Sequence, residues 1–213
     1  MSRTDRMRRV LDPGPAMAWL QDRPEHEGST GYAPEGHWPD STWVLSAIHE
    51  RRGRGWPWRR VTWADYLARP GNDSGNRSVP PCFRWFHDAV PSRTIRWPHE
   101  GSLDLTSFAA LLEVLAGVTP ADTECFAFWG GLSSGQWDVP DLWVGPLAAL
   151  PTLVRANGGD HDFTPSNVWP ADRSWFVWTD WDLDGTWVAG SAELVDSVRR
   201  HPVLETVEWS GAA

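Results

Sequence analysis

Asp180, Asp182 and Asp184 alternate with a tryptophan and a leucine. This is the spacing that opens a calcium-binding loop, where carboxylates at alternate positions supply oxygen ligands. The glutamate expected at the twelfth position of such a loop is missing, because Ser191 stands there. In an extended segment the three side chains would leave one face and repel one another. We expect Arg173 to neutralise them across a hairpin; a divalent-metal site and a carboxylate pair for acid/base catalysis are the alternatives.

A second candidate site interleaves five arginines with two tryptophans in residues 49–60, which read HERRGRGWPWRR. Guanidinium groups hold phosphates and indole rings stack on bases, so this composition is typical of anion or nucleotide binding. The competing interpretation, which we favour, is a surface loop. In that case its arginines, Arg59 and Arg60 among them, pair with acidic residues of the second half, while Trp56 and Trp58 cap the core.

The 17 tryptophans compensate for a modest apolar content of 41%, because each indole can bury about 150–250 Å². Trp129, Trp175 and Trp187 lie in or beside predicted strands, and we expect them to be buried. Trp56 and Trp58 should be more exposed than those three.

Residue types needed for several reaction classes are missing from the chain. All 19 basic residues are arginine, which excludes a lysine nucleophile, a Schiff base and the lysine of a phosphate-binding loop. Cys82 and Cys125 lack the CxxC spacing of a zinc site and are expected to be reduced thiols. The histidines do not fall at metal-ligand spacings. The sequence therefore singles out no catalytic residue, no metal and no cofactor.

The net charge of −9 is divided unevenly along the chain. Residues 1–100 carry 15 arginines against 12 acidic residues, whereas residues 101–213 carry 4 against 16. This asymmetry indicates either a partner with a basic surface or one half packing against the other. The net negative charge disfavours nucleic acid as a partner, because a protein binds nucleic-acid phosphates through positively charged side chains. Neither a membrane span of roughly 18 apolar residues nor a secretion signal is evident, so we expect a cytoplasmic protein and no membrane.

Apolar periodicity and breaker residues predict an α+β fold, with a mixed or antiparallel sheet packed against three to four helices. Expected helices begin after Thr62, at Asp104 or Thr106, at Pro146 and after Ser191, the third shortened by Pro151. Expected strands are 43–48, 125–129, 142–144, 203–209 and a hairpin of 175–179 with 186–189. Residues 1–40, broken by prolines and glycines, read as an irregular N-terminal arm before a single domain over residues 41–213.

Four stretches of the chain resemble a family of uncharacterised actinobacterial proteins. They are residues 106–129, 142–147, 168–175 and 182–191, the last two similar to a C-terminal block of the form NLWWPDDRAWCVATEIDFDSTYVGGS. The resemblance extends over about residues 42–209. It implies a shared fold and brings no activity with it. The cysteine and tyrosine of the family block are Phe176 and Trp187 here, so the block does not require a reactive thiol.

Two classes of function remain. We favour a binding protein that acts through protein contact, in which the acidic second half supplies the surface that contacts the partner. Its most concrete form is an immunity-type protein that neutralises a basic toxin, because acidic surfaces mask cationic sites and speed association. The alternative is a small-molecule-binding protein or enzyme with a tryptophan- and aspartate-lined pocket around residues 166–190. The candidate binding residues are Asp180, Asp182, Asp184, Arg173, Trp169, Arg59, Arg60, Trp56 and Trp58.

Overall fold

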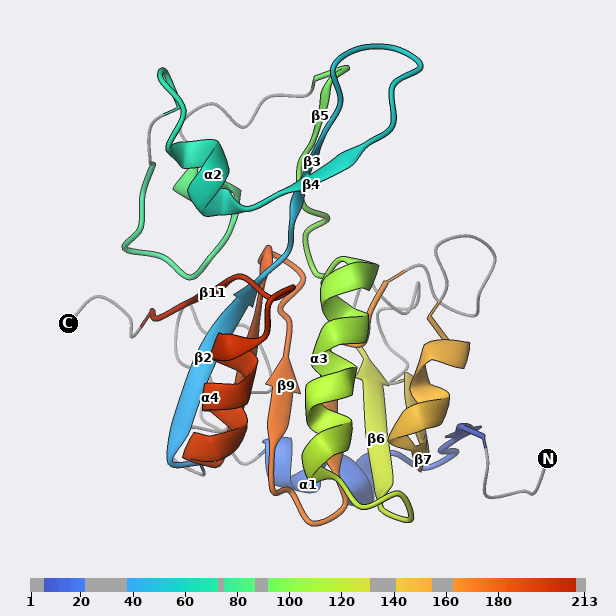
Figure 1. The fold of residues 1–213 in the computed structure, drawn as a ribbon. Helices are drawn as coiled ribbons and strands as arrows, with labels where there is room; N and C mark the ends of the chain where they lie inside the picture. The colour runs from blue at the N-terminus through green and yellow to red at the C-terminus, as the bar shows by residue number, and fades with distance from the viewer. Residues whose placement is uncertain are drawn as a thin grey trace.

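The computed structural model describes residues 6–21, 38–72, 75–86, 92–130, 141–154 and 163–209. These residues form the α+β fold that the sequence predicts, built on two antiparallel sheets (Figure 1). Within them, 3-10 helices accompany the α-helices, so helical segments outnumber the three to four expected. No helix of the described residues is long and apolar enough to cross a membrane.

The larger sheet has the strand order β1-β7-β6-β8-β9-β10-β2-β11, with antiparallel neighbours throughout. Its strands are β1 (Arg8–Arg9), β2 (Asp40–Leu45), β6 (Glu124–Trp129), β7 (Asp141–Pro146), β8 (Asn167–Pro170), β9 (Phe176–Trp178), β10 (Gly185–Gly190) and β11 (Thr206–Val207). The β9–β10 hairpin confirms the sequence prediction. The neighbour of β10 on its other side is β2, which lies far away in the chain.

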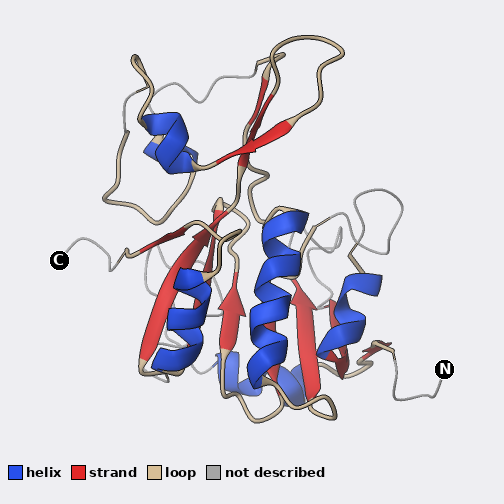
Figure 2. Cartoon of the chain, viewed as in Figure 1, coloured by secondary structure: helices blue, strands red, loops and turns tan. Residues whose placement is uncertain are grey.

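One face of this sheet is covered by α3 (Leu105–Val118), α4 (Ala192–Arg200) and the 3-10 helix η3 (Leu147–Thr152), as Figures 1 and 2 show. The caps predicted for α3 and α4 are confirmed, with Asp104 rather than Thr106 at the start of α3. The Asp104 side chain accepts a hydrogen bond from the Ser107 N–H, and Ser191 accepts one from the Leu194 N–H. Pro151 lies inside η3, which is shorter than the predicted 146–156 helix.

The opposite face is aromatic and is covered by α1 (Gly14–Gln21). Met17 and Leu20 of this helix are buried against Phe128, Trp169 and Phe176. The expectation of an irregular arm over residues 1–40 therefore has to be corrected for its described part: β1 joins the sheet, α1 covers it, and β2 begins at Asp40. The apolar run of α1 is too short to show a helical period, and its packing partners lie more than a hundred residues away.

A smaller sheet projects from the end of β2 and has the order β4-β3-β5 (Figure 1). It consists of β3 (Ile48–Glu50), β4 (Arg59–Val61) and β5 (Ile95–Arg96), accompanied by α2 (Trp63–Leu67) and the 3-10 helix η1 (Phe83–Trp85). Its own core contains Ile48, Val61, Trp63, Tyr66, Trp85 and Phe86. We call the described part of residues 48–100 the β3 lobe.

The tryptophans follow the predicted order only in part. Trp129 and Trp175 are buried in the core under α3 and α4, as predicted. Trp187 is half-buried, because it points to the aromatic face of the sheet and packs there with other indoles. Trp56 is exposed, whereas Trp58 is half-buried between two arginine side chains.

Candidate functional site

The stretch from Asp180 to Asp184 is a tight turn between β9 and β10. The Asp182 N–H donates to Asp180 Oδ1 at 3.0 Å, and the Leu183 N–H donates to the Asp180 carbonyl at 3.1 Å. Asp180 and Asp184 are buried while Asp182 is exposed. The expectation that the three carboxylates leave one face is therefore wrong, because it assumed an extended backbone.

Arg173 does not neutralise this turn. It lies at the other end of β9, in the β8–β9 connection, where its backbone is left-handed with φ 58°. Its guanidinium carbon stacks 4.6 Å from the ring of Trp19 in α1. Trp169 contacts the same indole, with ring centroids 5.8 Å apart. The structure thus places Arg173 and Trp169 together beneath α1 and separates both from the aspartates.

Asp184 is the most unusual carboxyl group of the turn. It is 2% exposed, one oxygen accepts a hydrogen bond from the Phe83 N–H, and Oδ1 has no hydrogen-bond partner. Burial, together with the negative charge of Glu100, raises the pKa of Asp184 from 3.8 to about 8. The group is therefore mostly protonated at neutral pH.

Pro81 of the β3 lobe and Gly101, directly after it, hold the turn in place. The Asp184 N–H donates to the Pro81 carbonyl at 3.0 Å, and the Gly101 N–H donates to the Leu183 carbonyl at 2.8 Å. Gly101 has φ 74°, and a Cβ there would lie 2.9 Å from the Trp181 Cα, so a side chain would push the two segments apart.

Aromatic and acidic side chains surround the turn at the surface. Trp181 is 44% exposed and Phe83 is 46% exposed, with the Arg84 guanidinium carbon 5.7 Å from the Phe83 ring. The carboxylates of Asp182 and Glu100, next to Trp181 and Gly101 in the chain, are exposed as well. We call Phe83, Glu100, Trp181 and Asp182 the turn patch. Sequence reasoning singled out Asp182 but missed the others, because no local pattern reveals that 81–83 and 99–101 meet at residues 180–184.

The 49–60 segment forms the tip of the β3 lobe. The ring of Trp58 has two guanidinium carbons near its centroid, that of Arg51 at 4.4 Å and that of Arg96 at 4.1 Å. Trp56 is 55% exposed, with the Arg52 guanidinium carbon 5.5 Å from its ring. We call Arg51, Arg52, Arg54, Trp56, Trp58, Arg93 and Arg96 the Arg–Trp tip.

Arg59 and Arg60 have structural partners instead. Arg59 pairs with Glu50 at 2.8 Å, next to it on the small sheet. Arg60 pairs with Asp104 at 3.3 Å and also donates to Ser107 and to the Val203 carbonyl, so it ties the β3 lobe to the start of α3. Hydrogen bonds from the Ala47 N–H and Ser107, with the positive charge of Arg60, outweigh burial and keep the pKa of Asp104 low. Arg60 therefore pairs with the acidic half, as predicted.

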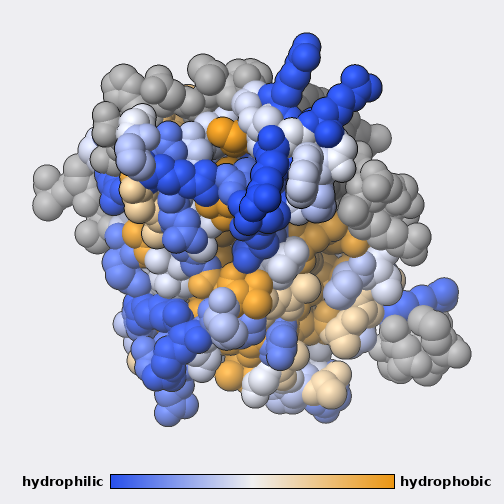
Figure 3. Space-filling view, turned by 45° about the horizontal axis from the view of Figure 1, so that its top comes forward, coloured by the Kyte–Doolittle hydropathy of each residue, from blue (hydrophilic) through white to orange (hydrophobic). Residues whose placement is uncertain are grey.

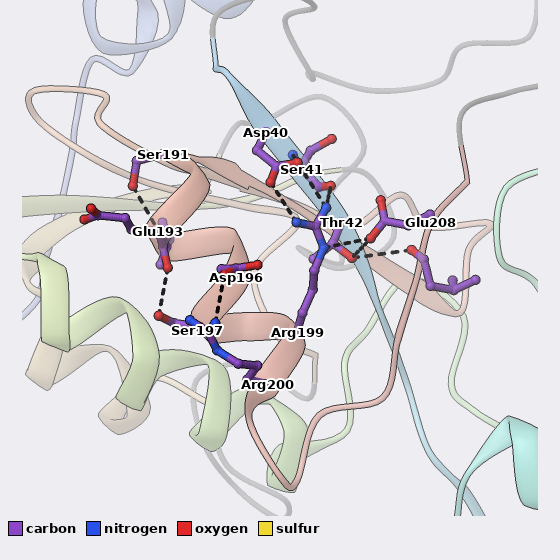
Figure 4. A network of polar contacts seen from close by, with 12 residues as sticks. Asp40, Ser41, Thr42, Ser191, Glu193, Asp196, Ser197, Arg199, Arg200 and Glu208 are labelled. Atoms are coloured by element: carbon purple, nitrogen blue, oxygen red, sulfur yellow. Dashed lines mark hydrogen bonds and ion pairs between the residues drawn. The ribbon is translucent and has the colours of Figure 1, made fainter.

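Further ion pairs join the two oppositely charged halves. Arg8 pairs with Glu124 at 2.7 Å and Arg9 with Asp141 at 2.9 Å, which fastens β1 to the sheet. In Figure 4, Arg199 of α4 reaches Asp40 of β2 and Glu208 beyond β11. The hydrogen bond from Arg199 lowers the pKa of Asp40. Part of the charge asymmetry is thus neutralised inside the molecule, which leaves fewer free carboxylates than the sequence suggests.

No group of three or more histidine, cysteine, aspartate or glutamate side chains within the described residues could hold a metal ion. Residues 131–135 read GLSSG and match the GxSxG spacing of a serine nucleophile, but they lie outside the described residues.

Asn167 in β8 is a buried polar residue that sequence reasoning missed. Its side chain is fully buried, and among the described residues neither its amide nitrogen nor its carbonyl oxygen has a hydrogen-bond partner. It lies in a cross-strand row between Phe128 and Trp178. Nothing in the sequence marks this asparagine as different from one on a surface.

Comparison of this chain with protein-family models, with curated proteins and with solved structures gives no match.

Proposed function

We propose that this chain is a binding protein that acts by surface contact, and that the turn patch is its docking face for a partner with a basic surface. The observation that carries the proposal is the exposed indole of Trp181 with Asp182 and Glu100 beside it. Exposed aromatic rings of this size are enriched at protein interfaces, where they anchor the contact.

The chemistry of the patch fits a cationic side chain. An arginine or lysine placed over the Trp181 ring gains a cation–π contact of about 0.5–1 kcal/mol at an exposed site. The exposed carboxylates of Asp182 and Glu100 would accept hydrogen bonds from such a cationic side chain. The hydrogen bonds that Asp180 accepts within the turn, and the one that the Gly101 N–H donates to it, fix the backbone beneath the patch, so little order has to be gained on binding.

The concrete form that we propose is an immunity-type protein that neutralises a basic toxin. Its acidic second half would steer a cationic partner toward the patch from a distance, and the aromatic rings would then hold it. The exposed acidic residues of α4, such as Glu193, would contribute to steering rather than to contact.

The alternative of a small-molecule or catalytic pocket around residues 166–190 has less support. Trp169 and Arg173 lie beneath α1, at the far end of β9 from Asp182. Neither described cysteine favours nucleophilic catalysis, because burial raises the pKa of the Cys82 thiol and raises that of Cys125 to about 12.

The test is binding of a short arginine-rich peptide, measured by fluorescence anisotropy, to the wild-type chain and to variants. Trp181→Ala and Asp182→Asn should each weaken binding about threefold to tenfold, the effect of losing one exposed cation–π or ionic contact. Glu193→Gln, which removes an exposed carboxylate from α4, is the matched control and should change affinity little. Equal losses in all three variants would mean that the acidic half attracts cations without a docking face.

A further inference from the structure

We propose that the Arg–Trp tip is a second binding surface, independent of the turn patch, and that its partner is single-stranded nucleic acid. The net charge of the whole chain argues against such a partner, but the structure separates the charges in space. Residues 48–100, which supply the β3 lobe, contain ten arginines against five acidic residues. Phosphates approaching this end of the molecule therefore meet an excess of cations.

The guanidinium groups of the tip are not neutralised. Within the described residues, Arg52, Arg54, Arg93 and Arg96 form no ion pair with a carboxylate. Glu50, the acidic residue of β3, is already bound by Arg59 at 2.8 Å and by Arg69 at 2.5 Å. The tip thus presents cations whose remaining donors face solvent.

The backbone gathers these cations at one end of the small sheet. Arg96 of β5 lies opposite His49 of β3, and the Arg51 N–H donates to the Thr94 carbonyl at 2.9 Å. The Arg51 side chain donates to the Arg93 carbonyl at 2.8 Å. Segments about forty residues apart therefore form one surface, and Figure 3 shows strongly hydrophilic side chains projecting from this end of the molecule.

The two indoles, Trp56 and Trp58, add aromatic surface to the cationic patch formed by the arginines. The guanidinium carbons of Arg51 and Arg96 lie 4.4 Å and 4.1 Å from the centroid of the Trp58 ring, so this indole holds both arginines at the tip. Trp56 stands further out at 55% exposure, on a turn in which its N–H donates to the Gly53 carbonyl and Gly55 has φ 88°. An exposed indole beside arginines is a platform on which an unpaired base can stack while the arginines contact the phosphates.

Stacking is what favours single-stranded nucleic acid over other polyanions. A duplex keeps its bases stacked on one another, and an acidic protein has no base to place on Trp56. Both would meet the same arginines, so the contribution of Trp56 distinguishes the partners.

The experiment titrates the full chain into fluorescein-labelled oligothymidylate and oligouridylate and follows anisotropy at several salt concentrations. We expect binding that weakens with salt, with Trp56→Ala weakening it about fivefold or more and Trp56→Phe retaining most of it. Arg52→Ala and Arg54→Ala should weaken binding and reduce the salt dependence. Preference between the two oligonucleotides would show whether DNA or RNA is the partner.

Trp181→Ala and Arg200→Ala, an exposed indole and an exposed arginine outside the lobe, are the matched controls and should bind as the wild type does. The proposal is overturned if polyglutamate competes as well as unlabelled oligothymidylate, if duplex DNA binds more tightly than the single strands, or if Trp56→Ala leaves the affinity unchanged. Absence of binding at low salt would overturn it as well.

Discussion

Asp184 shows how a single carboxyl group changes with its surroundings. The same residue type two positions earlier is exposed, whereas Asp184 is buried beside Pro81 and the Phe83 N–H. Water no longer solvates its charge, so the proton is retained. A sequence pattern of alternating aspartates cannot show this difference, because it depends on segments a hundred residues away.

The raised pKa of Asp184 predicts how stability depends on pH. The folded chain keeps the proton up to about pH 8, while the unfolded chain releases it near its ordinary value of 3.8. The folded state therefore binds more protons between these values, and this group's contribution to stability is lost as the pH rises. Asp184→Asn, which stays neutral, should gain stability relative to the wild type from pH 4 to pH 8, by about 1 kcal/mol or more.

Chemical denaturation across that pH range measures the difference. Asp182→Asn, which makes the same change at an exposed carboxylate of the same turn, is the matched control. A difference for Asp184→Asn that stays constant with pH would show that Asp184 is ionised in the folded protein.

Asn167 gives a second prediction for a single residue. Its amide and carbonyl lose their bonds to water on folding and gain none in return. Asn167→Leu, which is similar in size and apolar, should therefore raise the melting temperature or leave it unchanged. Thermal unfolding measures this, and a loss above about 2 kcal/mol would show that the asparagine has a partner in solution.

The positions of short elements were harder to predict from the sequence than those of helices that begin at a capping residue. Asp104 and Ser191 marked the starts of α3 and α4, and the β9–β10 hairpin followed from alternating residues around a polar turn. The strand β1 and the packing of α1 on the sheet escaped prediction, because both depend on distant partners rather than on local periodicity.

The packing of α1 predicts that the N-terminal segment matters for stability. Met17→Ala and Leu20→Ala should each cost about 2–5 kcal/mol, because both side chains are buried against the aromatic face. Leu11→Ala is the control: Leu11 is 96% exposed and its loss should cost less than about 0.5 kcal/mol. Equal and small effects in urea denaturation would restore the sequence-based expectation of a dispensable arm.

At the scale of the whole molecule, some charged side chains of the basic first half and the acidic second half form ion pairs with each other, and others stay exposed. Pairs such as Arg60–Asp104 and Arg199–Asp40 join parts that are far apart in the chain. Among the remaining charges, several arginines lie together at the Arg–Trp tip, and the exposed carboxylates of Asp182 and Glu100 belong to the turn patch. The sequence predicted the asymmetry, but which charges are paired depends on the topology of the sheets.

The claim that a basic partner docks at the turn patch is tested most directly by photo-crosslinking. A short arginine-rich peptide that carries a diazirine would be irradiated with the chain, and the modified residues identified by mass spectrometry. We predict crosslinks concentrated at Phe83, Glu100, Trp181 and Asp182, and their loss in Trp181→Ala. Crosslinks distributed over α4 and the other acidic surfaces, with no excess at the turn patch, would contradict the claim.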